Sequence, residues 1–95
     1  MQYKEEDGRF VALDGDKTAG EVTFQPAGDS MLIIDHTYVS DAYRGQGIAA
    51  ELVRHVVEKA RQMKVSIVPL CPFAKAEFAR KPAYHDVDAS HHAAD

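Results

Sequence analysis

The sequence has few residues of several kinds, and each shortage excludes a class of protein. A single cysteine, Cys71, rules out an intramolecular disulfide and a cysteine-rich zinc site. The longest apolar run, residues 31–34, is far shorter than the roughly 20 residues of a membrane helix, so no membrane partner is expected. The charged residues 1–7 are followed by no signal-peptide core, and we therefore expect a cytoplasmic protein.

The chain also has no excess of basic charge. Its 15 acidic residues outnumber 11 lysine and arginine residues, which gives a net charge of −4. Proteins that bind duplex nucleic acid usually carry a basic surface, so no nucleic-acid partner is expected. The 95 residues, 45% hydrophobic and 27% charged, have the composition of one globular domain spanning 1–95. So short a chain has a thin core, and a monomer and a homodimer are both compatible with it.

Basic residues nevertheless cluster in the middle of the chain. Residues 44–81 hold eight lysine and arginine residues against three acids, whereas residues 1–43 hold nine acids and three bases. One interpretation of this basic segment is a local anion-binding site. The other is a set of solvated helix faces.

Three strand-like segments, residues 9–13, 21–25 and 31–39, open the chain. The turn signals between them, Asp14-Gly15 and residues 26–29, are short and predict an antiparallel meander. In the third segment, alternation predicts one shared face for Leu32, Ile34, His36 and Tyr38.

A helix of about five turns is predicted over residues 46–63. Its apolar residues recur every three or four positions; they are Ala49, Leu52, Val53, Val56, Ala60 and Met63. A fourth strand over residues 65–70 would complete a β-α-β unit. A short helix over residues 72–80 follows, with Cys71 as its cap, Pro82 at its end, and Phe73, Ala74, Phe78 and Ala79 available for one face. The fold class is therefore α+β with a mixed sheet, and the polar residues 86–95, above all 88–95, are expected to fray.

Two glycines, Gly45 and Gly47, stand between the third strand and the long helix. Glycine lets a ligand approach the backbone closely, and a helix start offers unpaired N–H groups. With Arg44 beside them they predict a phosphate or pyrophosphate site, although a glycine-rich turn without a ligand has the same pattern. No P-loop motif is present. Gly45, Gly47 and Ala50 match a dinucleotide-binding pattern, but the chain is too short for a doubly wound sheet.

A third phosphate-binding pattern, Arg-x-x-Gly-x-Ala, is met by Arg44, Gly47 and Ala49 and resembles the acyl-CoA signature of the GNAT N-acetyltransferases. The resemblance extends to residues 36–39, 68–73 and 81–84, and it covers about residues 9–87. These segments are similar to the short, single-domain members of that superfamily. The resemblance implies a GNAT core in which the last parallel strand splays from its neighbour and admits the pantetheine arm of the coenzyme.

Acetyl-CoA is the co-substrate that the resemblance implies, and no metal is expected. The residues implied to contact it are Thr37, Tyr38, Val39, Arg44, Gly45, Gln46, Gly47, Ile48, Ala49, Cys71, Phe73 and Lys75. The strand residues among them, 37–39, would pair with the pantetheine arm through their backbone. The helical segment that ordinarily follows the first strand in larger members is missing, which leaves the acceptor site undefined.

Cys71 and His36 are the candidate catalytic residues. A helix start favours a thiolate, and the resemblance places Cys71 near the coenzyme thiol, as an acyl-accepting nucleophile, a general base or a packing residue. His36 is either a base that takes a proton from the attacking ammonium or from the thiol, or a core histidine. Tyr84 either packs on the core or protonates the leaving thiolate. Four residues near the tail are not expected to converge on a metal ion: His85, Asp86, His91 and His92.

The function expected from the resemblance is transfer of an acetyl group from acetyl-CoA to an unidentified amine. Direct transfer, with His36 or a water as base, is the first mechanism, and a Cys71 acyl-enzyme is the second. Two alternatives from other classes stay open. One is a non-catalytic module that binds or senses acyl-CoA, and the other is an interaction domain that has kept only the fold.

Overall fold

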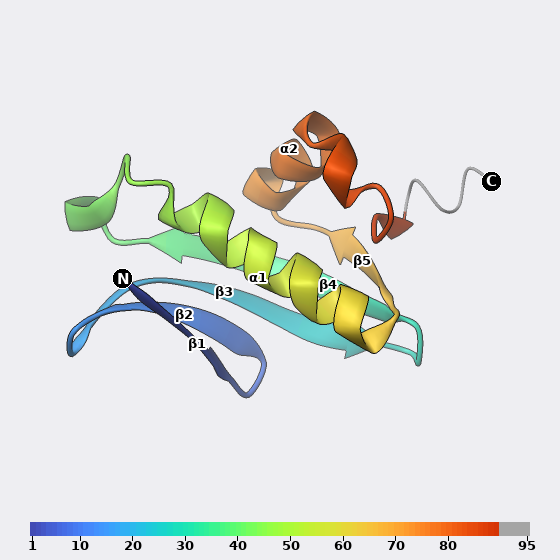
Figure 1. The fold of residues 1–95 in the computed structure, drawn as a ribbon, viewed down its shortest axis with the longest axis horizontal. Helices are drawn as coiled ribbons and strands as arrows, with labels where there is room; N and C mark the ends of the chain where they lie inside the picture. Colours follow the sequence, from blue (N-terminus) through green and yellow to red (C-terminus); the bar gives the residue numbers. More distant parts are fainter. Residues whose placement is uncertain (90–95) are drawn as a thin grey trace.

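One mixed sheet and two helices form the protein, of which this computed structural model describes residues 1–89 (Figure 1). The strands follow the order β1-β2-β3-β4-β5, antiparallel except for the parallel β4–β5 pair. Their bounds are Gln2–Glu6, Arg9–Asp14, Lys17–Ala27, Met31–Val39 and Ser66–Pro69. Helix α1 (Ile48–Met63) joins β4 to β5, and α2 (Pro72–Arg80) follows β5. The predicted α+β fold, a meander followed by a β-α-β unit and a short helix, is confirmed.

Strand β1 was not predicted. It pairs with β2 from Gln2 opposite Leu13 to Glu6 opposite Arg9. The signal for it was present, because Asp7-Gly8 is the same hairpin dipeptide as Asp14-Gly15, and Gly8 has a φ of 77°. Residues 2–6 contain one aromatic residue, Tyr3, among polar and charged ones. Their alternation of apolar and polar side chains is therefore too weak to predict a strand.

Helix α1 begins at Ile48, two residues after the predicted start. Gly47 has a φ of 77°, a left-handed conformation that a residue within a right-handed helix does not have, so Gly47 precedes the helix. The buried face of α1 consists of Ile48, Leu52, Val53, Val56, Val57 and Ala60. Met63, which was predicted for that face, is 49% exposed. Helix α1 runs along the sheet and contributes the centre of the core (Figure 1).

A β-bulge interrupts the alternation of side chains along β4. Ile34 pairs with Phe24, whereas His36 pairs with Thr23, so Asp35 is the extra residue. One extra residue moves every following side chain of the strand to the other face.

The bulge corrects the predicted orientation of the end of β4. Thr37 pairs with the buried Val22 and therefore faces the core. His36 and Tyr38 point to the opposite face, where both are exposed. The prediction that they share a face with the buried residues before the bulge is wrong.

Helix α2 has its predicted bounds, and Cys71 caps it as predicted. The Cys71 Sγ accepts a hydrogen bond from the Ala74 N–H at 3.3 Å. The buried face differs from the prediction, because Phe73 and Ala79 are exposed and Glu77 is 1% exposed. A glutamate thus occupies a core position that the apolar pattern assigned to neighbouring residues.

The segment after α2 packs against the core. A 3₁₀ turn, η2 (Pro82–Tyr84), buries Tyr84 with its ring 5.4 Å from Phe78, which supports its packing interpretation. Val87 is buried, and its carbonyl accepts a hydrogen bond from the Ile67 N–H at 2.5 Å. Val87 and Asp88, within the segment expected to fray, thus pair with Ile67 of β5, and residues 90–95 lie outside the described residues. Among the helices of residues 1–89, none is long and apolar enough to cross a membrane.

Candidate active site

Strands β4 and β5 separate halfway along β4. Their pairing covers residues 31–34 of β4, and a last hydrogen bond joins the Leu70 N–H to the Ile34 carbonyl at 3.1 Å. Beyond it the chain turns into α2, so residues 35–39 of β4 have no strand on that side within the described part of the chain. Their free N–H and C=O groups can pair with an extended ligand. The predicted splay, and the position of residues 37–39 on its edge, are therefore present.

Cys71 lies at the point where the two strands part. Its Sγ is 3.3 Å from the Thr37 Oγ1 and accepts the N–H of Ala74, and its side chain is buried. His36 lies on the other face of β4, with its ring 6.5 Å from the Tyr38 ring and nearly parallel to it. The structure thus brings Cys71 to Thr37 but does not bring it together with His36.

The glycine loop leads into the amino end of α1 with open space above its backbone. Gly45 and Gly47 have φ values of 84° and 77°, and a Cβ on either would meet no atom within 4 Å. No side chain caps α1. The first N–H groups of the helix, near Ile48 and Ala49, are therefore available to an anion, which the helix dipole also favours. Arg44 is paired with Asp41 at 2.9 Å and is mostly exposed.

A hollow of about 300 Å³ joins this loop to α2 and the end of β4. It is lined by Val39, Tyr43, Arg44, Gly45, Gly47, Ile48, Ala49, Ala50, Phe73 and Arg80. We call it the loop pocket. Its volume lies at the lower end of the usual range for ligand sites. Seven of the residues predicted to contact the co-substrate line the loop pocket; they are Val39, Arg44, Gly45, Gly47, Ile48, Ala49 and Phe73.

Other predicted contact residues lie elsewhere. Lys75 lines a separate hollow with Leu70 and Asp88. Gln46, Thr37 and Tyr38 do not line the loop pocket, although Thr37 and Tyr38 precede Val39, which does, on β4.

Sequence reasoning missed three residues of the loop pocket: Tyr43, Ala50 and Arg80. The Tyr43 hydroxyl donates to the Asp14 Oδ2 at 2.8 Å, and this bond to a carboxylate raises the pKa of Tyr43. It ties the turn η1 (Asp41–Tyr43) to the β2–β3 hairpin. Arg80 belongs to the basic segment, but its place on the wall of the pocket follows only from the packing of α2.

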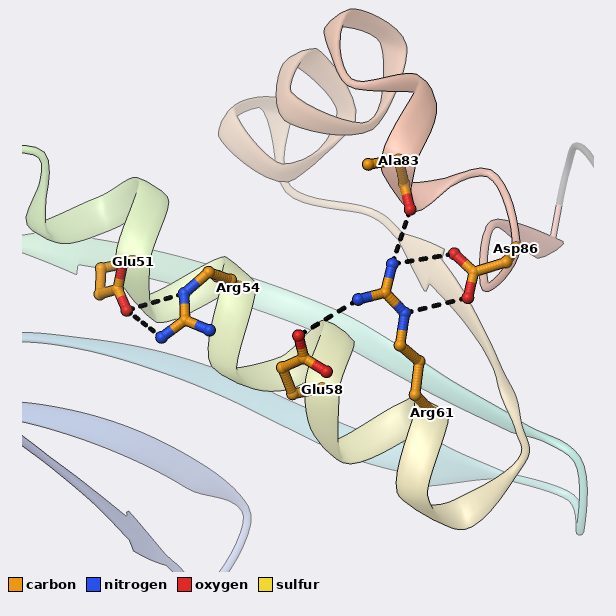
Figure 2. Close-up of polar contacts among 6 residues, drawn as sticks. All are labelled: Glu51, Arg54, Glu58, Arg61, Ala83 and Asp86. Atoms are coloured by element: carbon orange, nitrogen blue, oxygen red, sulfur yellow. Dashed lines mark hydrogen bonds and ion pairs between the residues drawn. The ribbon is translucent and has the colours of Figure 1, made fainter.

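Most of the basic segment is engaged in ion pairs. Arg54 pairs with Glu51, and Arg61 pairs with Glu58 and Asp86 (Figure 2). Similar pairs join Lys59 to Glu5 and Lys81 to Glu77. Arg44 and Arg80 are the basic residues that line the loop pocket. Ion pairs on helix faces therefore account for most of the basic segment, and the anion-binding interpretation stays a prediction that concerns Arg44 and Arg80.

A larger hollow of about 630 Å³ lies at the other end of α1, between Lys64 and Asp86, and none of the predicted site residues lines it. Within residues 1–89, no three His, Cys, Asp or Glu side chains gather closely enough to hold a metal ion. His91 and His92 lie outside the described residues.

A splayed parallel strand pair beside a glycine loop that opens into a helix defines the class of acyl-CoA-dependent N-acyltransferase folds. The chain belongs to the GCN5-related N-acetyl-transferase family, whose sequence model matches residues 9–87. A search of curated proteins gave no significant match.

Several solved structures resemble the chain over most of its length. A GCN5-like protein from Staphylococcus aureus is 33% identical with a TM-score of 0.77, and the match covers 92% of this chain and 86% of that one. YhbS from Escherichia coli, solved with CoA, is 25% identical with a TM-score of 0.65, over 81% and 48%. Rv2747 from Mycobacterium tuberculosis, also solved with CoA, is 21% identical with a TM-score of 0.65, over 83% and 56%. The chain thus spans most of the first protein but only about half of the other two.

Proposed function

We propose that the chain transfers an acetyl group from acetyl-CoA to an amine. The observation that carries this proposal is the loop pocket, where the amides of the glycine loop, Arg44 and Phe73 meet near the free edge of β4. An uncapped helix start and a cation suit a pyrophosphate, and an aromatic ring suits apolar parts of the coenzyme. The CoA complex of the E. coli relative supports the same ligand.

In the proposed reaction the amine nitrogen attacks the thioester carbonyl carbon. A C–N bond forms, the C–S bond breaks, CoA leaves as its thiolate, and the attacking amine gives up a proton. Backbone N–H groups on the free edge of β4 orient and polarise the carbonyl. The proton goes to His36 or to a water molecule.

The relative positions of His36 and Cys71 favour direct transfer over an acyl-enzyme. A nucleophilic cysteine usually needs a base within hydrogen-bonding reach. The neighbour of the Cys71 Sγ is the Thr37 hydroxyl at 3.3 Å, and His36 points to the opposite face of β4. In this proposal His36 therefore acts on an amine that approaches from the open face rather than on the thiol.

The binding step is tested by calorimetry with CoA and acetyl-CoA on wild-type protein and two glutamate variants. Gly47→Glu places a carboxylate at the helix start and should weaken CoA binding by about 100-fold or more. Gly28→Glu is the matched control, because Gly28 also has a positive φ and open space around a Cβ but lies in the β3–β4 turn. We expect it to leave the Kd for CoA unchanged. Equal affinity of wild-type and Gly47→Glu proteins would contradict the proposed pocket.

The transfer step is tested with labelled acetyl-CoA and a mixture of small amines, peptides and polyamines. Labelled product that requires intact protein supports the acetyltransferase. Binding of CoA by calorimetry without any labelled product would instead support a module that senses acyl-CoA.

A further inference from the structure

Glu77 is the buried charged residue of the described core. It lies on α2, one turn before Arg80, and its side chain is 1% exposed. Burial of an ionised carboxylate is costly unless cations compensate it. Glu77 has two such partners, since Arg80 contacts its Oε2 and the Lys81 Nζ lies 2.9 Å from its Oε1.

The two cations hold Glu77 in its ionised form. Burial by itself raises the pKa of Glu77, but the bonds from Lys81 and Arg80 outweigh it and lower that pKa below the ordinary value. No hydrogen bond of regular geometry reaches Oε1 within residues 1–89, so its ion pair with Lys81 is what compensates that oxygen.

The two cations differ in where they lie. The Arg80 side chain is 69% exposed and lines the loop pocket together with the glycine loop. Lys81 does not line that pocket, and its Nζ lies 5.4 Å from the centre of the Tyr84 ring. An exposed arginine ordinarily samples many rotamers, and fixing it costs conformational entropy. Anchoring its guanidinium to a buried carboxylate removes much of that freedom before a ligand arrives.

We propose that Glu77 is a positioning residue that fixes Arg80 on the wall of the loop pocket, where Arg80 contacts the pyrophosphate of the coenzyme. The inference rests on the proposed function, because it takes CoA as the ligand. The pyrophosphate is the group concerned because Arg80 shares the pocket with the amides of Gly47 and the start of α1. A guanidinium provides several N–H donors in a fixed plane, which suits phosphate oxygens.

Positioning of Arg80 and simple electrostatics predict opposite effects of Glu77→Gln on the affinity for CoA. Glu77→Gln keeps the side-chain shape and removes a negative charge near the pocket, so charge alone would strengthen the binding of a polyanion. Loss of positioning would weaken it. We expect Arg80→Ala and Glu77→Gln each to weaken CoA binding by about tenfold.

The test combines calorimetry and thermal denaturation on Glu77→Gln, Arg80→Ala, the double variant and Lys81→Gln. If Glu77 acts through Arg80, the double variant binds CoA no more weakly than Arg80→Ala alone. Lys81→Gln is the matched control, which should lower the Tm but leave the Kd for CoA unchanged. It isolates the stabilising role of the Glu77 cluster from the positioning role.

Pantetheine and dephospho-CoA identify the contacted group. Pantetheine carries no phosphate, so Arg80→Ala should not change its affinity, whereas dephospho-CoA keeps the pyrophosphate and should lose as much affinity as CoA. Tighter CoA binding by Glu77→Gln, unchanged binding by Arg80→Ala, or a loss confined to CoA would each overturn the inference. Unchanged CoA binding by Arg80→Ala overturns the inference even if Glu77→Gln does not fold. Wild-type protein that binds no CoA would overturn the proposed function itself.

Discussion

At the residue scale, Cys71 caps α2, and it is also the candidate thiol for acetyl transfer. Its Sγ caps α2 through the Ala74 N–H and lies 3.3 Å from the Thr37 hydroxyl. Those contacts link β4, β5 and α2 at the point where the strands part. A change at Cys71 therefore affects both the cap and any reaction of the thiol, and two variants are needed to separate them.

Cys71→Ala removes the cap and should destabilise the fold by about 1 kcal/mol, whereas serine keeps a capping oxygen and should cost less. If the thiol takes part in the reaction, both variants lose most acetyl transfer while the Kd for CoA stays near the wild-type value. Urea denaturation, calorimetry and the labelled-acetyl assay measure the three quantities. Full turnover in both variants would leave Cys71 with its structural task alone.

At the scale of elements, Arg61 attaches the C-terminal segment to α1. Its guanidinium donates to the Ala83 carbonyl at 2.6 Å, to both Asp86 carboxylate oxygens at 2.9 and 3.0 Å, and to Glu58 at 3.2 Å (Figure 2). The Val87 carbonyl that follows accepts the N–H of Ile67 in β5. Arg54, on the same helix, contacts only its neighbour Glu51 among the residues drawn in Figure 2.

Arg61→Gln should therefore destabilise the protein by about 1 kcal/mol, because it breaks a network that joins two elements. Arg54→Gln is the control and should change the free energy of unfolding by less than about 0.5 kcal/mol. Hydrogen exchange at the Ile67 amide reports the local effect, which we expect in Arg61→Gln and not in Arg54→Gln. Equal exchange in the two variants would show that Arg61 does not hold the segment.

At the scale of the whole molecule, the described chain measures 43 × 26 × 18 Å. The shortest of these extents is about the thickness of one sheet and one layer of helix. The side of β4 away from α1 carries the exposed His36 and Tyr38. The first strand, β1, is joined to β2 by the two-residue turn Asp7-Gly8, with no helical segment between them. In the proposed reaction, the acceptor amine would approach from this exposed side of β4.

Stability should fall in acid because two glutamates have lowered pKa values. Burial raises the pKa of Glu77, but Lys81 and Arg80 lower it by more, while the pKa of Glu51 is lowered chiefly by its hydrogen bond from Arg54. A lowered folded-state pKa stabilises the protein above the ordinary glutamate value of about 4.3, and this stabilisation is lost as pH falls through the folded value. Urea denaturation between neutral and acidic pH should show a steeper loss for wild-type protein than for Glu77→Gln. Parallel pH profiles would contradict a contribution from Glu77.

The fold class, helix α2 with its cap, and the glycine loop could all be predicted from local patterns in the sequence. These features depend on contacts between near neighbours: a hairpin dipeptide, the three- and four-residue spacing of α1, and a cap at Cys71 before proline. Seven of the residues predicted to contact the co-substrate line one pocket because five of them lie close together in the chain, within residues 44–49.

The faces of His36 and Tyr38, and the meeting of residues that are distant in the sequence, could not be predicted because they depend on how whole elements pair and pack. The bulge at Asp35 is set by pairing with β3, and it reverses His36 and Tyr38 although the alternation of β4 taken alone is regular. Glu77 is buried because two cations compensate it, a condition that no apolar pattern expresses. Arg80 reaches the loop pocket only because α2 packs beside α1, and proximity of that kind depends on the packing of whole elements rather than on local spacing.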